Sequence, residues 1–242
     1  MENNKEIFTK IAVFASFALI LICIIMIFYV FGREFFKINN YKYDMYAKKV
    51  VRAYNDINKA LYKHEEAHVL NKILFLRISP KTETLESFMQ KMDIKKKKDC
   101  GLNDKKGGCW WDKKYITKTS FGLDKYASEY YTFIDKHNNA VYVYKDPYWG
   151  FLMVYDVNGK DKGPNTRGED IFYFQTGPDN IEFVPGGEDQ LASNKRLANG
   201  CFKYRYCTAW VVRTGNMEYM KADEHGVCPN GRHLSWYNTK CN

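Results

Sequence analysis

A long apolar run near the amino terminus dominates the pattern of hydrophobic and polar positions. Residues 11–31 read IAVFASFALILICIIMIFYVF, without a charge, a glycine or a proline. A helix of this length reaches about 30 Å at ~1.5 Å per residue, which matches the hydrocarbon core of a bilayer. Arg33 and Glu34 follow where a signal peptide would have small residues at its cleavage site. The sequence therefore predicts an uncleaved membrane span at 11–31, after a short flank at 1–10.

The helical pattern continues beyond this run. Five apolar residues recur at three- and four-residue steps, with charged residues between them: Tyr46, Val50, Tyr54, Ile57 and Leu61. This spacing is typical of a helix with one buried face and one solvent-exposed face. Residues 33–79 contain neither glycine nor proline, and Pro80 ends the stretch. We expect residues 32–79 to continue the first helix as its amphipathic half.

Short runs rich in Val, Ile, Tyr and Phe replace the helical pattern after residue 139. They are separated by turn-forming segments and lie at 140–145, 151–157, 170–176, 181–184 and 208–213. Such runs are typical of antiparallel strands. A short helix is also expected around 84–92, with Thr82 or Thr84 as its cap. The sequence thus predicts an α+β domain at 80–242, in which the long first helix packs on a small antiparallel sheet.

Composition narrows the class of protein. The 242 residues include 37 Lys and Arg against 28 Asp and Glu, a net charge of +9, and 45% of them are hydrophobic. Such a chain can build a core, which excludes wholesale disorder. A mean hydropathy of −0.50 excludes a polytopic transporter. One anchored domain fits this length.

The cysteines indicate disulfides. Cys23 lies in the apolar run, and the other six form three couples that are local in sequence: Cys100 and Cys109, Cys201 and Cys207, Cys228 and Cys241. An even set in loop-like sequence is typical of an oxidising compartment. Six cysteines allow 15 pairings, so the local couples are one interpretation among these. Zinc is the competing interpretation, but none of the couples has CxxC spacing.

Orientation in the membrane rests on the same cysteines. Lys and Arg are more numerous after the span than before it, which alone would keep the domain in the cytoplasm. Long domains can be exported despite flanking charge, so the cysteines outweigh this count. We expect a single-pass protein of the cytoplasmic (inner) membrane, in contact with lipid, whose carboxy-terminal domain is extracytoplasmic.

One loop carries a candidate metal site. The segment YDVNGKDKGPNTRGED at 155–170 lies between two expected strands and is rich in oxygen-bearing side chains and glycines. Calcium takes six to eight oxygen ligands, so Asp156, Asn158, Asp161 and Asp170 are candidate ligands, with Asn165 and Glu169 nearby. The glycine spacing does not match an EF-hand. The alternative interpretation, which the sequence favours, is a long hairpin loop stabilised by Asx turns.

Catalytic motifs are scarce. His64-Glu65-Glu66-Ala67-His68 matches the pattern H-E-x-x-H, in which two histidines one helical turn apart bind zinc and the glutamate acts as base. A membrane-anchored zinc hydrolase is therefore an alternative function, although the charged surroundings are more typical of a solvated helix face. No Walker loop, nucleophile elbow or dinucleotide-binding glycine pattern occurs. We expect a protein that is not an enzyme, with no small-molecule substrate identified.

A basic segment offers a further alternative. Lys95, Lys96, Lys97 and Lys98 precede Trp110 and Trp111, and more lysines lie between and after them. Lysines neutralise phosphates and exposed aromatic rings stack on bases, so the segment is a candidate surface for DNA or another polyanion. A solvated loop, or one that faces lipid headgroups, is the interpretation the sequence favours.

Two segments resemble a known family. DVNGKDKGPNTRGEDIFYF, residues 156–174, resembles the D-x-N-G, G-P-N and G-x-D-x-F block of pilin-like proteins. CTAWVVRTGNMEYM, residues 207–220, resembles their closing Cys-x-Ala-Trp-Val segment. With the expected helix and sheet, the chain is similar to type IV pilins and to pseudopilins of type II secretion. The resemblance implies a subunit of a surface filament or secretion-related assembly, with other pilin-like subunits as partners.

The amino terminus departs from that family. Pilin precursors carry Gly-Phe-Thr-Leu-x-Glu before the apolar run. Here Phe8 and Thr9 echo this motif, but no glycine precedes Phe8, Lys10 stands in place of Leu, and the glutamate is missing. The chain therefore resembles a pilin-like protein that lacks a standard prepilin cleavage motif.

Overall fold

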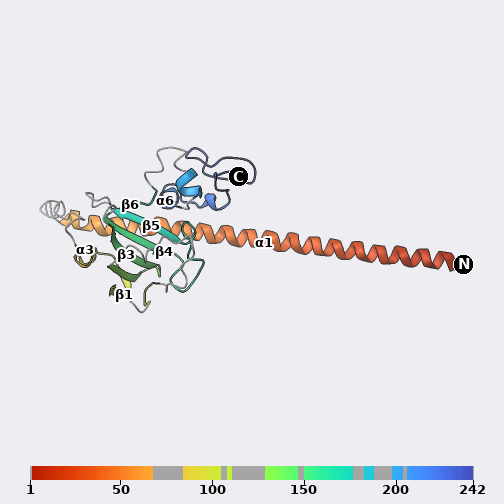
Figure 1. Ribbon diagram of the computed structural model, residues 1–242, viewed down its shortest axis with the longest axis horizontal. Coiled ribbons are helices and arrows are strands. Elements are labelled where there is room, and N and C mark those ends of the chain that lie inside the picture. Colours follow the sequence, from red (N-terminus) through yellow and green to blue (C-terminus); the bar gives the residue numbers. More distant parts are fainter. Residues whose placement is uncertain are drawn as a thin grey trace. The chain divides into compact units, whose positions relative to one another are not determined.

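The computed structural model describes residues 2–67, 84–104, 108–110, 129–146, 150–176, 183–187, 198–203 and 206–241. Within the first helix the side chains of residues 2–18, 33, 35–38 and 61–67 lie outside this description. The chain divides into two units, residues 1–42 and 43–242. Figure 1 labels the helices and strands.

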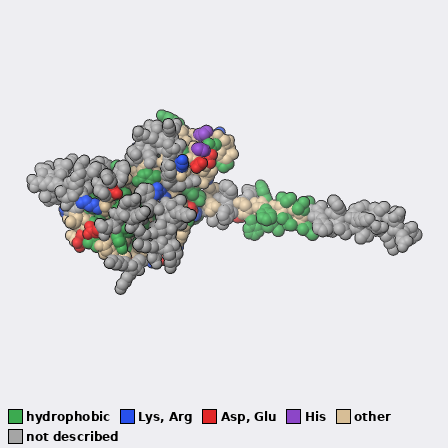
Figure 2. Space-filling model, viewed as in Figure 1, with side chains coloured by type: hydrophobic (Ala, Val, Ile, Leu, Met, Phe, Trp, Pro, Cys, Tyr) green, Lys and Arg blue, Asp and Glu red, His purple; other side chains and the backbone are tan. Residues whose placement is uncertain are grey.

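The first unit is helical. Helix α1 (Glu2–Ala67) begins in it and extends into the second unit. Apolar side chains from Leu19 to Phe31 are exposed along this part of the helix (Figure 2). Residues 11–18 of the expected span lie outside the described side chains. Among the residues that the structure describes, no helix is both long enough and apolar enough to cross a membrane.

The second unit contains a six-stranded antiparallel sheet. Its strands are β1 (Lys96–Leu102), β2 (Tyr130–Asp135), β3 (Ala140–Asp146), β4 (Gly150–Asp156), β5 (Ile171–Thr176) and β6 (Phe183–Pro185). Each strand pairs with the next along the chain, so the sheet is a meander. The expected α+β class and the strands at 140–145, 151–157 and 170–176 are confirmed. Of the expected strand at 181–184, residues 181 and 182 lie outside the described residues, and 183–184 belong to β6.

Strands β1 and β2 were not predicted from the sequence. Strand β1 reads KKKDCGL and lies at the edge of the sheet. Lysines are poor strand formers but are common on edge strands, where their charge discourages pairing with other chains. Pairing with β2 and the Cys100–Cys109 disulfide stabilise β1 where local propensity does not.

Buried side chains lie on both faces of the sheet. Successive residues of a strand point to opposite faces, so each face carries its own cluster. One face carries large apolar residues of β2 to β6: Phe133, Val141, Val143, Phe151, Met153, Tyr155, Phe172, Phe174 and Phe183. The opposite face carries a second cluster that includes Trp110, Tyr142, Tyr144, Leu152, Val154 and Tyr173. The strands therefore contribute buried side chains to both faces of the sheet.

The amphipathic half of α1 covers the first face. Its buried residues recur at helical spacing and join the same core as the strands: Tyr46, Ala47, Val50, Ala53, Ile57 and Ala60. The rings of Tyr54 and Phe174 stack at 6.0 Å. In Figure 1 this part of α1 runs beside β3, β4 and β5. The predicted apolar stripe at Tyr46, Val50, Tyr54 and Ile57 is confirmed, and the side chain of Leu61 lies outside the description.

Two shorter helices complete this core. Helix α3 (Leu85–Lys91) is capped by Thr84, whose Oγ1 accepts a hydrogen bond from the N–H of Ser87 at 3.2 Å. This confirms the expected helix around 84–92. Phe88 of α3 stacks on Phe151 of β4 at 3.9 Å between ring centroids.

Residues 208–213 form a helix, so the predicted strand there was wrong. Helix α6 (Thr208–Thr214) lies between the π-helical turn η3 (Ala198–Lys203) and the 3₁₀ turn η4 (Glu218–Met220). Valines favour strands locally, but tertiary packing overrides this preference. Trp210 and Val211 are buried in the core, and Gly215 ends the helix with φ +67°.

Three disulfides link the sequence-local couples: Cys100–Cys109, Cys201–Cys207 and Cys228–Cys241. The structure thus selects the local interpretation among the fifteen pairings. Cys23 is free and exposed on α1.

The packing of α1 on the sheet predicts a cost for shortening Ile57. This side chain is 0% exposed, so Ile57→Ala should lower the free energy of unfolding by about 2 to 5 kcal/mol, because it leaves a cavity. Arg52→Ala changes an exposed position of the same helix and should stay within about 0.5 kcal/mol. Urea unfolding followed by the fluorescence of the buried Trp210 measures both. Equal effects would contradict the placement of Ile57 in the core.

Candidate cation site in the loop between β4 and β5

The pairing of β4 with β5 places two carboxylates at one end of the sheet. Asp156 ends β4 and lies opposite Ile171, and Asp170 immediately precedes Ile171. The backbone N–H of Val157 donates to the carbonyl of Asp170 at 2.9 Å. Both aspartates are fully buried. The register of two adjacent strands therefore sets the distance between the carboxylates.

Asp170 organises the loop. Its Oδ1 accepts a hydrogen bond from the backbone N–H of Thr166 at 2.6 Å, and its Oδ2 accepts one from that of Asn165 at 2.9 Å. The side-chain amide of Asn158 also donates to Oδ2, at 2.8 Å. These donors explain how a buried carboxylate is tolerated here. Burial nevertheless raises the pKa of Asp170 above its usual range.

Asp156 is satisfied on one oxygen only. Its Oδ1 accepts from the backbone N–H groups of Asn158 at 3.1 Å and Gly159 at 3.0 Å, which forms an Asx turn. Gly159 has φ +92°, a conformation that favours glycine. Oδ2 of Asp156 is buried without a hydrogen-bond donor among the described residues, and the same holds for Oδ1 of Asn158. Burial, then the charge of Asp170, raise the pKa of Asp156 to about 7.

Lys49 of α1 approaches the loop from the helix. Its Nζ donates to the carbonyl of Val157. Burial, followed by the charge of Lys162, lowers the pKa of Lys49, whereas the charges of Asp135 and Asp156 oppose this shift. Lys49 was not predicted as a site residue, because the helical pattern shows only that it lies off the buried stripe and not which strand end it faces.

The oxygen atoms fit a hard divalent cation. Oδ2 of Asp156 and Oδ1 of Asn158 are buried acceptors without a described donor, and the Asp170 carboxylate lies beside Asn158. Carboxylate and amide oxygens are the ligands of calcium. The structure thus brings together three of the four predicted ligands, which would hold the cation. Asp161 is separate: its side chain is 80% exposed and pairs with Lys160 at 2.8 Å.

The loop also shows the features of the alternative interpretation. Backbone N–H groups bind Oδ1 of Asp156 and both oxygens of Asp170, so Asx-type turns shape the loop in the absence of any ion. These turns provide no hydrogen-bond donor to Oδ2 of Asp156. A buried acceptor without a donor costs free energy that a cation or a proton would recover.

The basic segment does not form a stacking surface in its described part. Lys96 donates to Asp99 and Tyr131, Lys97 to Asn138, and Lys98 to the carbonyl of Gly108. Trp110 is 8% exposed and packs on Tyr142, with 5.5 Å between ring centroids. Trp111 lies outside the described residues. Three of the four lysines thus have partners within the protein, and Trp110 belongs to the core.

The zinc motif lies outside the part of the chain whose side chains the structure describes. The side chains of His64, Glu65, Glu66 and Ala67 are not described, and His68 lies outside the described residues. Where side chains are described, the histidine, cysteine and acidic groups close enough to share a metal are Cys100, Asp104 and Cys109. Both of these cysteines are in a disulfide and offer no thiolate.

Comparisons of this chain with models of known protein families, with curated proteins and with solved structures find no match.

The raised pKa of Asp156 predicts an unusual dependence of stability on pH. With a chelator present, the free energy of unfolding should fall as pH rises from about 4 to about 7. In this range the folded protein holds a proton that the unfolded chain, with the ordinary pKa of 3.8, releases. A shift of about three pKa units corresponds to about 4 kcal/mol. Urea unfolding at several pH values measures this.

Asp156→Asn provides the control for this dependence. The amide keeps an acceptor for the N–H groups of Asn158 and Gly159 but does not titrate. The slope should therefore flatten, with a smaller remainder of the same sign from Asp170, whose pKa is also raised. A slope that Asp156→Asn leaves unchanged would contradict the assignment to this carboxyl.

Calcium should stabilise the folded protein at pH 7.5. A ligand at about 100 times its Kd adds about 2.7 kcal/mol to the free energy of unfolding, and thermal unfolding with and without calcium measures the gain. Asp156→Asn should abolish it, because the variant lacks the second carboxylate oxygen. Asp161→Asn, at the exposed aspartate of the same loop, should retain it. An undiminished gain in Asp156→Asn would rule out this site.

Proposed function

We propose that this protein is a membrane-anchored, pilin-like or pseudopilin-like subunit that serves assembly or binding rather than catalysis. The observation that carries the proposal is the packing of the amphipathic half of α1 on an antiparallel meander. A long first helix packed on such a sheet is the arrangement implied by the resemblance of residues 156–174 and 207–220 to pilin-like proteins.

The exposed apolar part of α1 supports an anchoring role. Large side chains between Leu19 and Phe31 point to solvent, for example Phe28 with 74% of its surface exposed. A continuous apolar surface of this kind is unfavourable in water and is stabilised by lipid or by neighbouring apolar helices. The uninterrupted apolar sequence at 11–31 is long enough for a span. Lipid and other copies of the same helix are the partners that fit.

The three disulfides support an extracytoplasmic domain. Each closes a short loop, and bridges of this kind persist in oxidising compartments. They lie in the second unit, on the carboxy-terminal side of the apolar run. The proposed topology therefore places residues 1–10 in the cytoplasm and the sheet outside the inner membrane.

The pilin-like block has a structural role that agrees with this proposal. Its Asp156, Asn158 and Asp170 form the loop between β4 and β5, and Phe172 belongs to the core beneath α1. The block thus stabilises the junction of sheet and helix. The zinc-hydrolase alternative rests on residues that are not described, and no described contact favours the polyanion alternative.

Topology and anchoring are tested together in the full chain. Alkaline phosphatase fused after residue 242 should be active, a fluorescent protein fused there should be dark, and the protein should stay in the membrane after carbonate extraction. Ile22→Lys combined with Ile25→Lys should release it, because each central lysine costs about 2.5 to 3.5 kcal/mol. Tyr41→Lys, at an exposed residue outside the run, should remain bound. A fluorescent carboxy-terminal fusion would overturn the topology.

Assembly is tested through Cys23, the free cysteine of α1. If neighbouring helices pack side by side, oxidation in intact membranes should join two copies through Cys23 and give a dimer on a non-reducing gel. Cys23→Ser should give none. A protein that stays monomeric after oxidation, although it is anchored, would contradict lateral packing through this face of the helix.

A further inference from the structure

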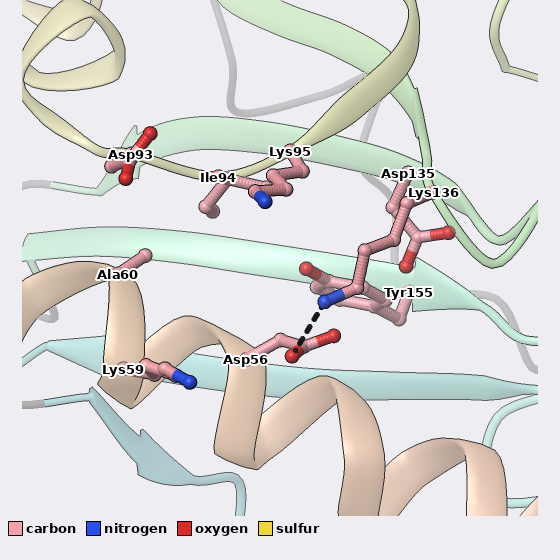
Figure 3. A pocket seen from close by; sticks show the side chains of 9 residues that line it. All are labelled: Asp56, Lys59, Ala60, Asp93, Ile94, Lys95, Asp135, Lys136 and Tyr155. Atoms are coloured by element: carbon pink, nitrogen blue, oxygen red, sulfur yellow. Dashed lines mark hydrogen bonds and ion pairs between the residues drawn. The ribbon is translucent and has the colours of Figure 1, made fainter.

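Carboxylates gather at two places in the second unit: a cavity, and the loop between β4 and β5. The cavity in Figure 3 has a volume of about 250 Å³ and is lined by three aspartates and three lysines. Lys136 donates to Oδ1 of Asp56 there at 2.9 Å, so charges of both signs are already paired. In the loop, by contrast, Asp156 is 0% exposed and its Oδ2 has no donor among the described residues. A cation is therefore expected in the loop rather than in the cavity.

Tyr219 holds the arm of this loop that leads into β5. It lies in η4 and is 0% exposed, and its hydroxyl donates a hydrogen bond to the carbonyl of Gly168 at 2.7 Å. Gly168 lies two residues before Asp170, and its own N–H donates to the carbonyl of Ile171 at 3.0 Å. The φ of Gly168, +72°, lets the chain fold back between these two contacts. The Tyr219 hydroxyl therefore fixes the turn from which Asp170 projects.

The geometry of this turn determines where the Asp170 carboxylate lies. The carbonyl of Thr166 accepts the backbone N–H of Asp170 at 3.2 Å, and the Asp170 carboxylate accepts the N–H of Thr166 at 2.6 Å. The amide of Asn158, from the other arm of the loop, donates to Oδ2 of Asp170 at 2.8 Å. A displacement of Gly168 would thus move the Asp170 carboxylate relative to Asn158 and Asp156, which are the other candidate ligands.

The position of Tyr219 is itself fixed by the carboxy-terminal disulfide. Glu218, the residue before it, accepts the backbone N–H of Cys241 at 3.0 Å and the ammonium group of Lys221 at 2.7 Å. Cys241 is in turn bonded to Cys228. A buried ring on a segment that is held in this way loses little freedom when its hydroxyl binds a partner. Such a side chain is suited to holding another element in place.

We propose that Tyr219 is a positioning residue of the candidate cation site and couples this site to the carboxy-terminal segment that carries η4. Groups that orient the ligands of a metal ion contribute to its affinity although they do not touch it. Coupling between two sites is reciprocal, so a cation that requires the turn at Gly168 also stabilises the contact between Gly168 and Tyr219. This inference rests on the candidate cation site and is independent of the proposed function.

Calorimetric titration of the full chain in detergent with calcium at pH 7.5 tests the positioning role. Tyr219→Phe removes one oxygen atom and leaves the buried carbonyl of Gly168 without this donor, so the Kd for calcium should rise about fivefold. Tyr237→Phe is the matched control, because Tyr237 is 98% exposed, and its Kd should stay within about twofold of the unaltered protein. If Tyr219→Phe lowers the free energy of unfolding in a chelator but leaves the Kd unchanged, the role of Tyr219 is in stability alone and the proposal is overturned.

Hydrogen exchange of the unaltered protein tests the coupling and decides it even if Tyr219→Phe does not fold. At exchange times too short for global unfolding, saturating calcium should slow amide exchange in the loop and, about fivefold, at residues 216–222, because reciprocity requires the same factor. Helix α3, which packs on Phe151 at the other end of β4, should not change. In Tyr219→Phe the slowing at 216–222 should disappear, while that of the loop remains.

The outcomes separate this inference from the site on which it rests. Slowing that is confined to the loop would overturn the coupling while the cation site stands. Absence of any calcium response in the unaltered loop would remove the cation site and this inference together. Either failure leaves the anchoring and assembly experiments unaffected.

Discussion

The packing of one helical stripe on one sheet face is the constraint on which the second unit depends. Ala47, Ala53 and Ala60 let α1 approach the strands closely, while Val50 and Ile57 fill the space between them. Large residues on the strands and small residues on the helix fit one another as dense packing requires. Because side chains alternate along each strand, this one contact also fixes which residues belong to the opposite cluster.

Burial of the apolar stripe brings the charged flank of α1 against the ends of strands. Lys49 meets the carbonyl of Val157 where β4 ends, and Asp56, two turns further along, meets Lys136 and His137 just after β2. The contacts of Lys49 and His137 are partly buried, where charges interact more strongly than on an open surface, whereas the contact of Lys136 is exposed. The loop between β4 and β5 lies at one end of this boundary, and Asp56 lies at the other. Hydrophobic packing thus determines where the charged chemistry of the protein can occur.

Periodicity predicted the elements whose local preference agrees with their tertiary surroundings. The stripe from Tyr46 to Ile57 and the three central strands have both the pattern and the burial of their class, so the sequence alone was sufficient. The predictions for strand β1 and helix α6 failed for opposite reasons. The lysines of β1 do not favour a strand, but pairing with β2 and a disulfide stabilise one. The valines of α6 favour a strand, but burial of Trp210 and the cap at Gly215 accompany a helix.

The candidate site was predictable in composition but not in geometry. Oxygen-bearing residues with closely spaced glycines indicated a cation loop, yet composition gave Asp161 the same weight as Asp156. The two differ because Asp156 is the last residue of a strand and Asp161 lies in the middle of the loop. Strand register buries the first carboxylate beside Asp170, and solvent surrounds the second. A prediction of ligands from sequence therefore improves when residues at predicted strand ends are weighted above those at the loop's centre, since the strand ends are the positions that pairing holds in place.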